Sequence, residues 1–181
     1  LRPLYLSLSD VTLSALHDYL RSPSSSPLLL AGQEGSGGSV LLKRLLSEIS
    51  ETGHKTLPRN YGRAPLIVSY FVGSVDNPGT SYLDVLRHFI SCVETEFPKK
   101  VGNGEEGGFV ENMSSDQRTI KRFREILSVV HKFCSVVWCI DGLHVLENEP
   151  LPGSHKSSQE PWLWLPTDLP ASVKLVASVN F

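Results

Sequence analysis

Four short apolar runs divide the chain, and each has the profile of a β-strand. They are bounded by Gly, Pro or polar residues, and runs of this length that are rich in Val, Ile and Leu fit strands better than helices. Continuous apolar runs without alternation are typical of strands covered on both faces. The sequence therefore predicts strands over Pro27–Ala31, Leu66–Val72, Ser135–Ile140 and Val173–Val179.

Between these runs, apolar residues recur three and four positions apart, which is the spacing of an amphipathic helix. Ser, Thr and Asp residues at the expected starts can cap the first turn. We expect four helices. The first starts at Ser9–Asp10 and runs to Leu20, and the second spans Val40–Ile49. The third starts at Thr80–Ser81 and runs to Val93, and the fourth starts at Ser114, Ser115 or Asp116 and runs to Val130.

This order of elements predicts an α/β fold in three layers, a parallel sheet with helices on both faces. In such sheets ligands bind at the carboxyl ends of the strands. A chain of 181 residues, 40% of them hydrophobic, is the size of one compact domain. We divide it into a lead-in helix and turn at 1–26 and a core at 27–181. Because it starts at Leu1 without Met and ends at Phe181 on an expected strand, we expect a fragment.

Two polar stretches are expected to be loops. Residues Pro98–Gly108 contain four glycines and a single apolar residue, which predicts a mobile surface loop. Glu147–Pro161 is polar and proline-rich, and it also fits a loop. The apolar stretch Trp162–Leu165 that follows has two interpretations, a surface for a protein partner or a cover for the edge of the sheet.

Charge, cysteine content and the length of apolar stretches limit the partners and the cellular location that we expect for the protein. The formal net charge is -2 and the pI about 6.3, so no overall field favours nucleic acid, and we expect no nucleic-acid partner. The three cysteines have no C-x-x-C spacing, which fits reduced, buried thiols. No stretch approaches 18 apolar residues, so we expect no membrane partner and a cytoplasmic location.

Residues Gly32–Ser39 read Gly-Gln-Glu-Gly-Ser-Gly-Gly-Ser, which matches the P-loop pattern G-x-x-x-x-G-K-[ST] at every specified position except the lysine. Glycines let the backbone turn so that successive N–H groups point inward, and the next helix adds its positive end. Ser39 supplies a hydroxyl for Mg²⁺. The predicted nucleotide-binding residues are Gly32, Gly35, Ser36, Gly37, Gly38, Ser39 and Val40.

Gly38 stands where the pattern has its lysine. That lysine reaches the outer phosphates, and a charge-assisted contact is worth on the order of 1.5 to 3 kcal/mol, so its loss weakens binding by one or two powers of ten. Turnover suffers more, because the same charge stabilises the transition state. Lys43 and Arg44 follow on the next helix but do not return to the face of Gly38, so we expect neither to replace the missing lysine and both to be solvent-facing charges.

Asp141 ends the third predicted strand, where P-loop proteins place the acid that holds Mg²⁺. The predicted metal-binding residues are therefore Ser39 and Asp141. A second acid that polarises water usually follows closely, and the candidates here are His144 and Glu147. A histidine beside an apolar strand is more often a packing or capping residue than a base. We therefore assign no catalytic residue.

Three other functional classes, namely GTPases, zinc-binding proteins and serine hydrolases, fit the motifs of this sequence poorly. A GTPase would show Asp-x-x-Gly, but Asp141-Gly-Leu-His144 lacks the final glycine. His144, His155 and Cys139 have no zinc-ligand spacing. A serine hydrolase would need G-x-S-x-G, whereas Ser36 is flanked directly by glycines.

Four groups of segments carry a resemblance to a known family. They are Leu28–Leu42, Tyr70–Ser74 with Leu86–Arg87, Val136–Leu146, and Trp164–Pro170 before Val173–Ser178. Together they resemble the NACHT-type nucleotide-binding domain of STAND P-loop ATPases. Those of nephrocystin-like and telomerase-associated-protein-like repeat proteins are the most similar, and the resemblance covers about Leu28 to Phe181.

The resemblance implies an ATP- or ADP-binding switch with Mg²⁺ in a larger signalling or scaffold protein, with protein partners bound through flanking repeats. It assigns Gly32–Ser39 to Walker A, Asp141 to Walker B and Ser178 to the region of sensor 1. The chain departs from the family at Gly38 and at His144, where a second acid is usual, and it stops before the family's C-terminal subdomains. Both substitutions affect catalysis.

Three alternatives for the function remain open: a switch with weak or no hydrolysis, a non-binding pseudo-ATPase scaffold, and an ATPase with a divergent site. Homo-oligomerisation also stays open.

Overall fold

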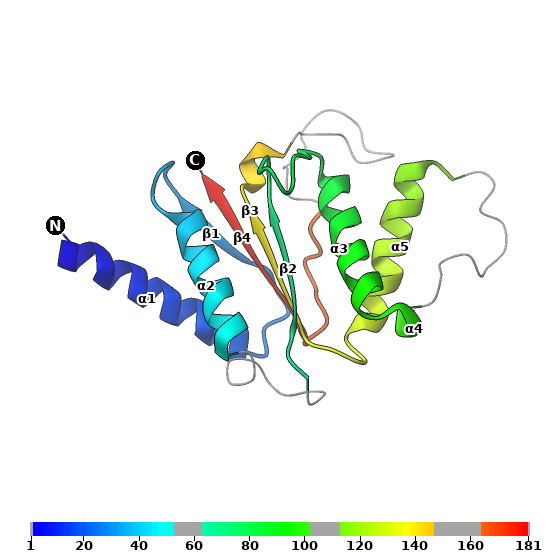
Figure 1. Ribbon diagram of the computed structural model, residues 1–181, viewed down its shortest axis with the longest axis horizontal. Coiled ribbons are helices and arrows are strands. Elements are labelled where there is room, and N and C mark those ends of the chain that lie inside the picture. Colours follow the sequence, from blue (N-terminus) through cyan, green and yellow to red (C-terminus); the bar gives the residue numbers. More distant parts are fainter. Residues whose placement is uncertain (1, 53–62, 102–112, 147–163, 181) are drawn as a thin grey trace.

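The computed structural model describes residues 2–52, 63–101, 113–146 and 164–180. Within these residues, four parallel strands form one sheet in the order β1-β4-β3-β2 (Figure 1). The elements in chain order are α1 (Arg2–Arg21), β1 (Leu28–Gly32), α2 (Gly38–Thr52), β2 (Leu66–Phe71), α3 (Tyr82–Glu96), α4 (Pro98–Val101), α5 (Ser115–Val130), β3 (Val136–Asp141), the 3₁₀ turn η1 (Leu143–Val145) and β4 (Val173–Asn180).

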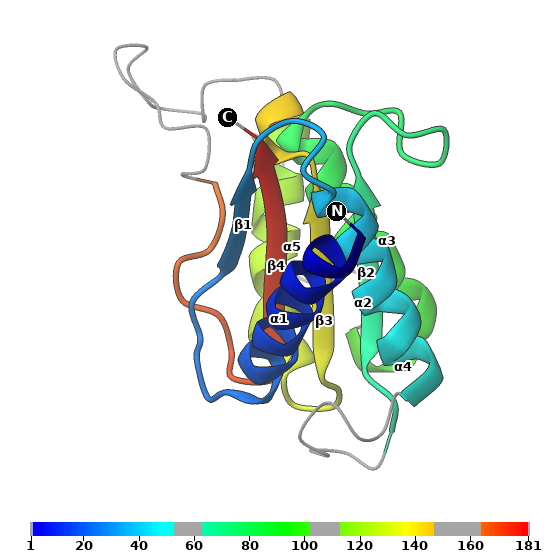
Figure 2. The same ribbon diagram turned by 90° about the vertical axis from the view of Figure 1, so that its left-hand side faces the viewer.

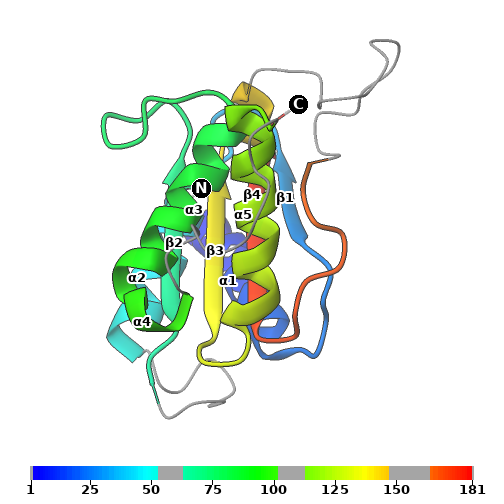
Figure 3. The ribbon, with the colours of Figure 1, turned by 90° about the vertical axis from the view of Figure 1, so that its right-hand side faces the viewer.

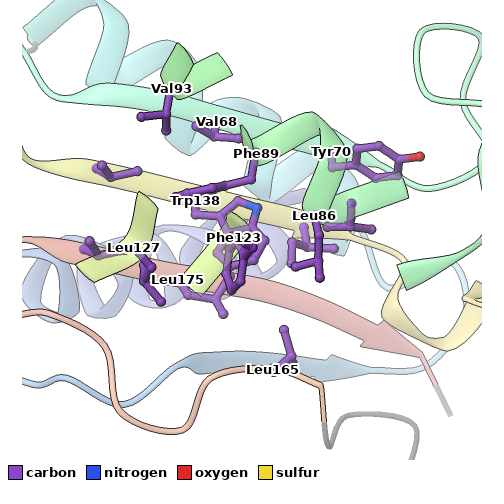
Figure 4. Packing of buried hydrophobic residues seen from close by; sticks show 14 of the residues in the cluster. Val68, Tyr70, Leu86, Phe89, Val93, Phe123, Leu127, Trp138, Leu165 and Leu175 are labelled. Carbon is purple, nitrogen blue, oxygen red and sulfur yellow. The ribbon is translucent and has the colours of Figure 1, made fainter. Parts of the chain in front are cut away.

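Helices cover both faces of the sheet, which confirms the predicted three-layer α/β class. Helices α1 and α2 pack on one face, where their leucines meet Val137, Cys139 and Val176 of the central strands (Figure 2). Helices α3 and α5 pack on the other face (Figure 3). There Trp138 of β3 lies against Phe89 of α3 and Phe123 of α5, with ring centroids 4.7 and 5.5 Å away (Figure 4).

Local signals in the sequence set the starts of two helices on this second face. Ser81 caps α3 by accepting a hydrogen bond from the N–H of Leu83. Ser114 and Gln117 form a reciprocal capping box at the start of α5. Both starts agree with the predicted positions, because Ser at these positions satisfies N–H groups that the helix itself leaves unpaired.

The first helix starts earlier than predicted. It includes Arg2, so Ser9 and Asp10 lie inside the helix and do not cap it. The residues before Ser9 hold no glycine, and Pro3 falls in the first turn, where a missing N–H costs no helical hydrogen bond. Asp10 instead pairs with Arg44 of α2 at 2.9 Å.

Strand β1 is not buried on both faces as its apolar run suggested. It forms one edge of the described sheet, its side chains are alternately half-buried and exposed, and Leu29 is 46% exposed. Leu28 and Leu30 face the α1–α2 side, while the other face of the strand has little cover. The apolar run therefore predicted the strand correctly, but it did not predict that the strand lies at the edge of the described sheet.

Two predicted loops are described only in part. The first residues of the predicted loop Pro98–Gly108 form the short helix α4, which is a correction, and residues 102–108 lie outside the described residues. The second expected loop, Glu147–Pro161, also lies outside them.

Of the stretch Trp162–Leu165, the described residues are Trp164 and Leu165. Trp164 stacks on Tyr82 of α3 at 5.8 Å between ring centroids, and Leu165 is buried in the core beside α3 and α5. These two side chains therefore cover the α3–α5 side of the core.

The cysteines behave as packing residues. Cys134 and Cys139 are buried and Cys92 is half-buried, and all three are free thiols. Burial raises the pKa of Cys139 to about 12, and burial together with the Glu96 carboxylate raises the pKa of Cys134 to about 11. Both thiols therefore stay protonated and unreactive at neutral pH.

A buried lysine ties the end of α1 to the sheet. Lys174 of β4 is 2% exposed, and its ammonium donates to the carbonyls of Ser22, at 2.7 Å, and Ser24. It also lies 5.3 Å from the ring centre of Tyr19, whose hydroxyl donates to the carbonyl of Leu175. Burial lowers the pKa of Lys174. The two carbonyls belong to the turn that follows α1, and they give the buried ammonium hydrogen-bond acceptors in place of water.

We predict that Lys174→Met destabilises the fold by about 1 to 3 kcal/mol, because the apolar stem is kept while two carbonyls lose their donor. Urea unfolding followed by circular dichroism measures the change. Lys132→Met is the matched control, since Lys132 is exposed, and it should change stability by less than about 0.5 kcal/mol. Equal effects of the two substitutions would contradict the structural role of Lys174.

Candidate functional site

The candidate residues meet at the carboxyl edge of the sheet. Strand pairing places Phe71 beside Asp141, and Ile140 beside Ala177, so that Asp141 lies next to Ser178. Ser178 in turn pairs with Leu30 of β1. Side chains alternate along a strand, and all these positions share the face that carries α1 and α2. They form a row across the sheet, which we call the edge row: Leu30, Ser178, Asp141 and Phe71.

The glycine-rich loop arches from the end of β1 to the start of α2 above this row (Figure 2). Gly35 and Gly37 have φ of +78° and +92°, which only glycine adopts readily. A Cβ atom on Gly32 would come within 2.5 Å of the Ser36 Oγ. Gly35 and Gly37 are thus needed for their backbone conformation, and Gly32 lets the Ser36 side chain lie close to the backbone.

The start of α2 presents unpaired backbone donors. Leu41 makes the first helical hydrogen bond, donating to the Gly37 carbonyl at 2.9 Å. Among the described residues, no backbone carbonyl accepts from the N–H groups of Gly38, Ser39 or Val40. The Val40 side chain is apolar and 71% exposed, so its polar contribution to a site is its backbone N–H group. Three free N–H groups at the positive end of a 15-residue helix form a place for an anion.

A cleft of about 500 Å³ adjoins this helix start. Its polar side is the backbone of Gly32 and residues 36–38, with Asn180 of β4. Its apolar lining comes from β1 and from Leu41 of α2, and Thr12 of α1 also lines it. A cleft with polar backbone groups on one side and apolar side chains on the other can bind a ligand that is anionic at one end and flat and apolar at the other.

Asp141 is held by β4. Its Oδ1 accepts a hydrogen bond from the Ser178 hydroxyl, and that hydroxyl accepts one from the N–H of Gly142 at 2.9 Å. Gly142 has a φ of +85°, which turns the chain sharply after the strand. The Oδ2 atom takes part in no hydrogen bond among the described residues. The carboxylate is therefore oriented by one oxygen and retains a second for a ligand.

His144 is hydrogen-bonded to the end of β4. Its Nδ1 accepts from the N–H of Asn180 at 3.2 Å, and the side-chain amide of Asn180 lies 3.4 Å from its Nε2. This arrangement agrees with the expected packing or capping role. The contact between His144 and Asn180 could not be predicted from the sequence, because the two residues are 36 positions apart. Glu147, the other candidate, lies outside the described residues.

Gly38 faces the edge row directly. A Cβ atom built on it would lie 3.8 Å from the Ser178 Cβ, an ordinary van der Waals distance. The backbone of Gly38 is therefore compatible with larger residues, and its own φ does not require glycine. The local structure would therefore accept a lysine at position 38, although the sequence has a glycine there.

The two cations that follow on α2 differ from each other. Arg44 pairs with Asp10 at 2.9 Å and with Glu48 at 3.1 Å, so it joins α1 to α2. Lys43 is exposed, as expected, but its ammonium lies over the Phe71 ring at 5.2 Å from the centroid. Spacing along the helix had indicated only that Lys43 does not return to the face of Gly38, and it could not predict the contact with Phe71.

Two other hollows, each of about 590 Å³, lie away from the carboxyl edge. In the one between α1 and α2, Glu48 accepts from His17 at 2.8 Å and from Arg44, and the His17 contact is the main reason that the pKa of Glu48 is lowered. In the one between α3 and α5, Arg122 pairs with Glu94 at 2.7 Å. Their charges are largely paired with one another, which makes both hollows poor candidates.

The residues that could hold a metal ion are Ser39 and Asp141. Ser39 is exposed, and its hydroxyl has no partner among the described residues. Within those residues no group of three His, Cys, Asp or Glu side chains could surround a metal ion. A cation here would consequently need oxygen ligands from a bound phosphate and water, which is how Mg²⁺ is commonly held.

Comparison with protein-family models and with curated proteins finds no match for this chain. Membership of the NACHT family therefore stays a prediction from the quoted motifs. In the part of the chain that the structure describes, no helix is long and apolar enough to cross a membrane.

The loop geometry predicts opposite effects for two adjacent substitutions. Gly37→Ala should destabilise the fold by about 1 to 2 kcal/mol, because an L-residue is strained at its positive φ. Gly38→Ala should be neutral or stabilise by about 0.4 to 1 kcal/mol, because its conformation suits alanine and the unfolded chain loses freedom. Urea unfolding of both variants tests this. Destabilisation by Gly38→Ala as large as by Gly37→Ala would contradict the loop geometry.

Proposed function

We propose that this chain binds ATP or ADP with Mg²⁺ and acts as a nucleotide-dependent switch with weak or no hydrolysis. The observation that carries the proposal is the set of free N–H groups of Gly38, Ser39 and Val40, beside a cleft at the carboxyl edge of the sheet. The ordered motifs of the NACHT-type domain support the choice of nucleotide. The larger signalling or scaffold protein and the flanking repeats are inferred from that resemblance alone.

The residues present fit a nucleotide with its metal. The glycine-rich loop offers open space, since Cβ atoms on Gly35 and Gly37 would meet nothing within 4 Å. Phosphate oxygens would accept from the N–H groups at the start of α2, and the apolar side of the cleft would take the base. Ser39 and the free Oδ2 of Asp141 would hold Mg²⁺, which neutralises phosphate charge when bound.

Weak or absent hydrolysis follows from the side chains that the chain lacks. Gly38 brings no charge to the outer phosphates, and the Asn180 contact engages the ring of His144. Binding depends mainly on backbone groups, whereas transition-state stabilisation depends on charged side chains placed at the phosphates. The site therefore retains more of its binding than of its catalysis.

A second candidate function is a pseudo-ATPase scaffold that binds no nucleotide. The absence of a cation at Gly38 favours it, because the loop then offers only backbone donors. An ATPase with a divergent site is the third hypothesis, and it requires phosphate release that Asp141→Asn abolishes.

We predict calorimetrically detectable binding of MgATP and MgADP to the purified protein at millimolar or lower nucleotide. Asp141→Asn should weaken MgATP binding at least about tenfold and leave metal-free ATP nearly unaffected, because the carboxylate acts through the metal. Asp168→Asn, at an exposed acid of the final crossover, is the matched control and should bind like the wild type. Absence of any binding at millimolar nucleotide would reject the switch.

Gly38→Lys separates the two candidate functions. The Cβ fits at that position, so the variant should fold, and it should tighten MgATP binding by about ten- to a hundredfold through a new charge-assisted contact. Binding that is present in the wild type and tightened in the variant supports the switch. If binding occurred only in the variant, the natural protein would be a scaffold.

A further inference from the structure

We propose that Lys43 supplies the phosphate-binding cation that is missing at Gly38. This inference rests on the proposed nucleotide function and concerns which side chain completes its site. The pattern G-x-x-x-x-G-K-[ST] places the cation in the loop itself. Here the geometry points to a lysine in the second turn of α2 that approaches the same edge of the sheet from a neighbouring strand.

The position of the Lys43 ammonium is the first observation. It lies 5.2 Å from the centre of the Phe71 ring, at the carboxyl end of β2. Phe71 pairs in register with Asp141, so the ammonium lies above the strand adjacent to the candidate metal-binding acid. Adjacent strands are about 4.8 Å apart. The ammonium is thus already at the edge row.

The course of α2 over the sheet explains how Lys43 reaches this position. Gly38 at the start of the helix lies over Ser178 of β4, and Lys43 lies over Phe71 of β2. The helix therefore crosses the row obliquely, and Asp141 of β3 lies between these two contacts. Gly38 and Lys43 lie on different faces of α2, as the spacing indicated. They lie over β4 and β2, and both strands are neighbours of β3, which carries Asp141.

Lys43 also shares a helix face with the metal-binding hydroxyl. It follows Ser39 by four residues, which places the two side chains on the same side of α2. Helical side chains lean toward the N-terminus of their helix, so the lysine stem extends toward Ser39 and the free N–H groups. A phosphate at the helix start and a cation at Ser39 would both lie on the path of this side chain.

Lys43 is free to change partner, and its neighbour is not. Among the described residues the Lys43 ammonium has no carboxylate partner, and it lies against the aromatic ring of Phe71 alone. A cation–π contact at an exposed site is weak, so a bound phosphate would displace it readily. Arg44 is already paired with Asp10 and Glu48, so a phosphate would have to compete with two carboxylates for it.

Calorimetric titration of four proteins with MgATP tests the proposal. We expect Lys43→Met to weaken binding at least about tenfold, which corresponds to about 1.4 kcal/mol, and Lys43→Arg to stay within about threefold of the wild type. Lys132→Met removes an exposed lysine at the opposite end of the sheet and should change nothing. Adenosine, which lacks phosphate, should bind the wild type and Lys43→Met equally.

The double variant Gly38→Lys/Lys43→Met distinguishes a phosphate contact from a packing role. If Lys43 replaces the loop lysine, the new lysine restores binding to at least the wild-type level. If Lys43 matters only through its contact with Phe71, the double variant stays weak, and Phe71→Leu weakens binding as Lys43→Met does. Either of these last two results would overturn the proposal.

Failure of this inference can be told from failure of the proposed function. If the wild type binds MgATP and Lys43→Met binds equally well, the nucleotide site stands and Lys43 is not part of it. If the wild type binds nothing, the proposed function fails and this inference fails with it.

Discussion

The oblique packing of α2 against the sheet is the constraint on which the site depends. Leu42, Leu45 and Ile49 anchor the helix in the core that it shares with α1 and the central strands. This anchoring fixes the start of the helix over Ser178 and its second turn over Phe71. The loop before the helix must then turn sharply within a few residues, which is why two of its glycines have positive φ. Packing on the apolar side of α2 thus sets the polar geometry at its start.

Backbone and side chains contribute separately to this site. The N–H groups at the start of α2 are present because a helix leaves its first donors unpaired, whatever residues stand there. A cation depends on one residue type at one place, so a single substitution removes it. A loop with no lysine at position 38 therefore keeps its free N–H groups. The separation also explains why a phosphate-binding loop gives a firmer prediction of binding than of turnover.

The sequence predicted the elements well where the signal was local. Helical spacing and Ser caps located α3 and α5, because a cap and an apolar stripe act within a few residues. The predictions failed where a neighbour distant in sequence decided the outcome. The apolar run of β1 suggested burial on both faces, but the strand lies at the edge of the described sheet. Asp10 was taken for part of a helix start, but it forms an ion pair with Arg44 across two helices.

The sequence by itself determined the alternation of strands and helices, the glycines of the loop, and the acid at the end of β3. Each of these follows from residue type and short-range spacing. Only the tertiary structure decided that the hydroxyl of Ser178 orients Asp141, that Asn180 engages His144, and that the ammonium of Lys43 lies at the edge row. The physical reason for the first two is strand order: β4 is inserted between β1 and β3, and this brings together residues that are more than 30 positions apart in the chain. The third follows from the packing of α2 across the sheet, which places Lys43 over Phe71 of β2.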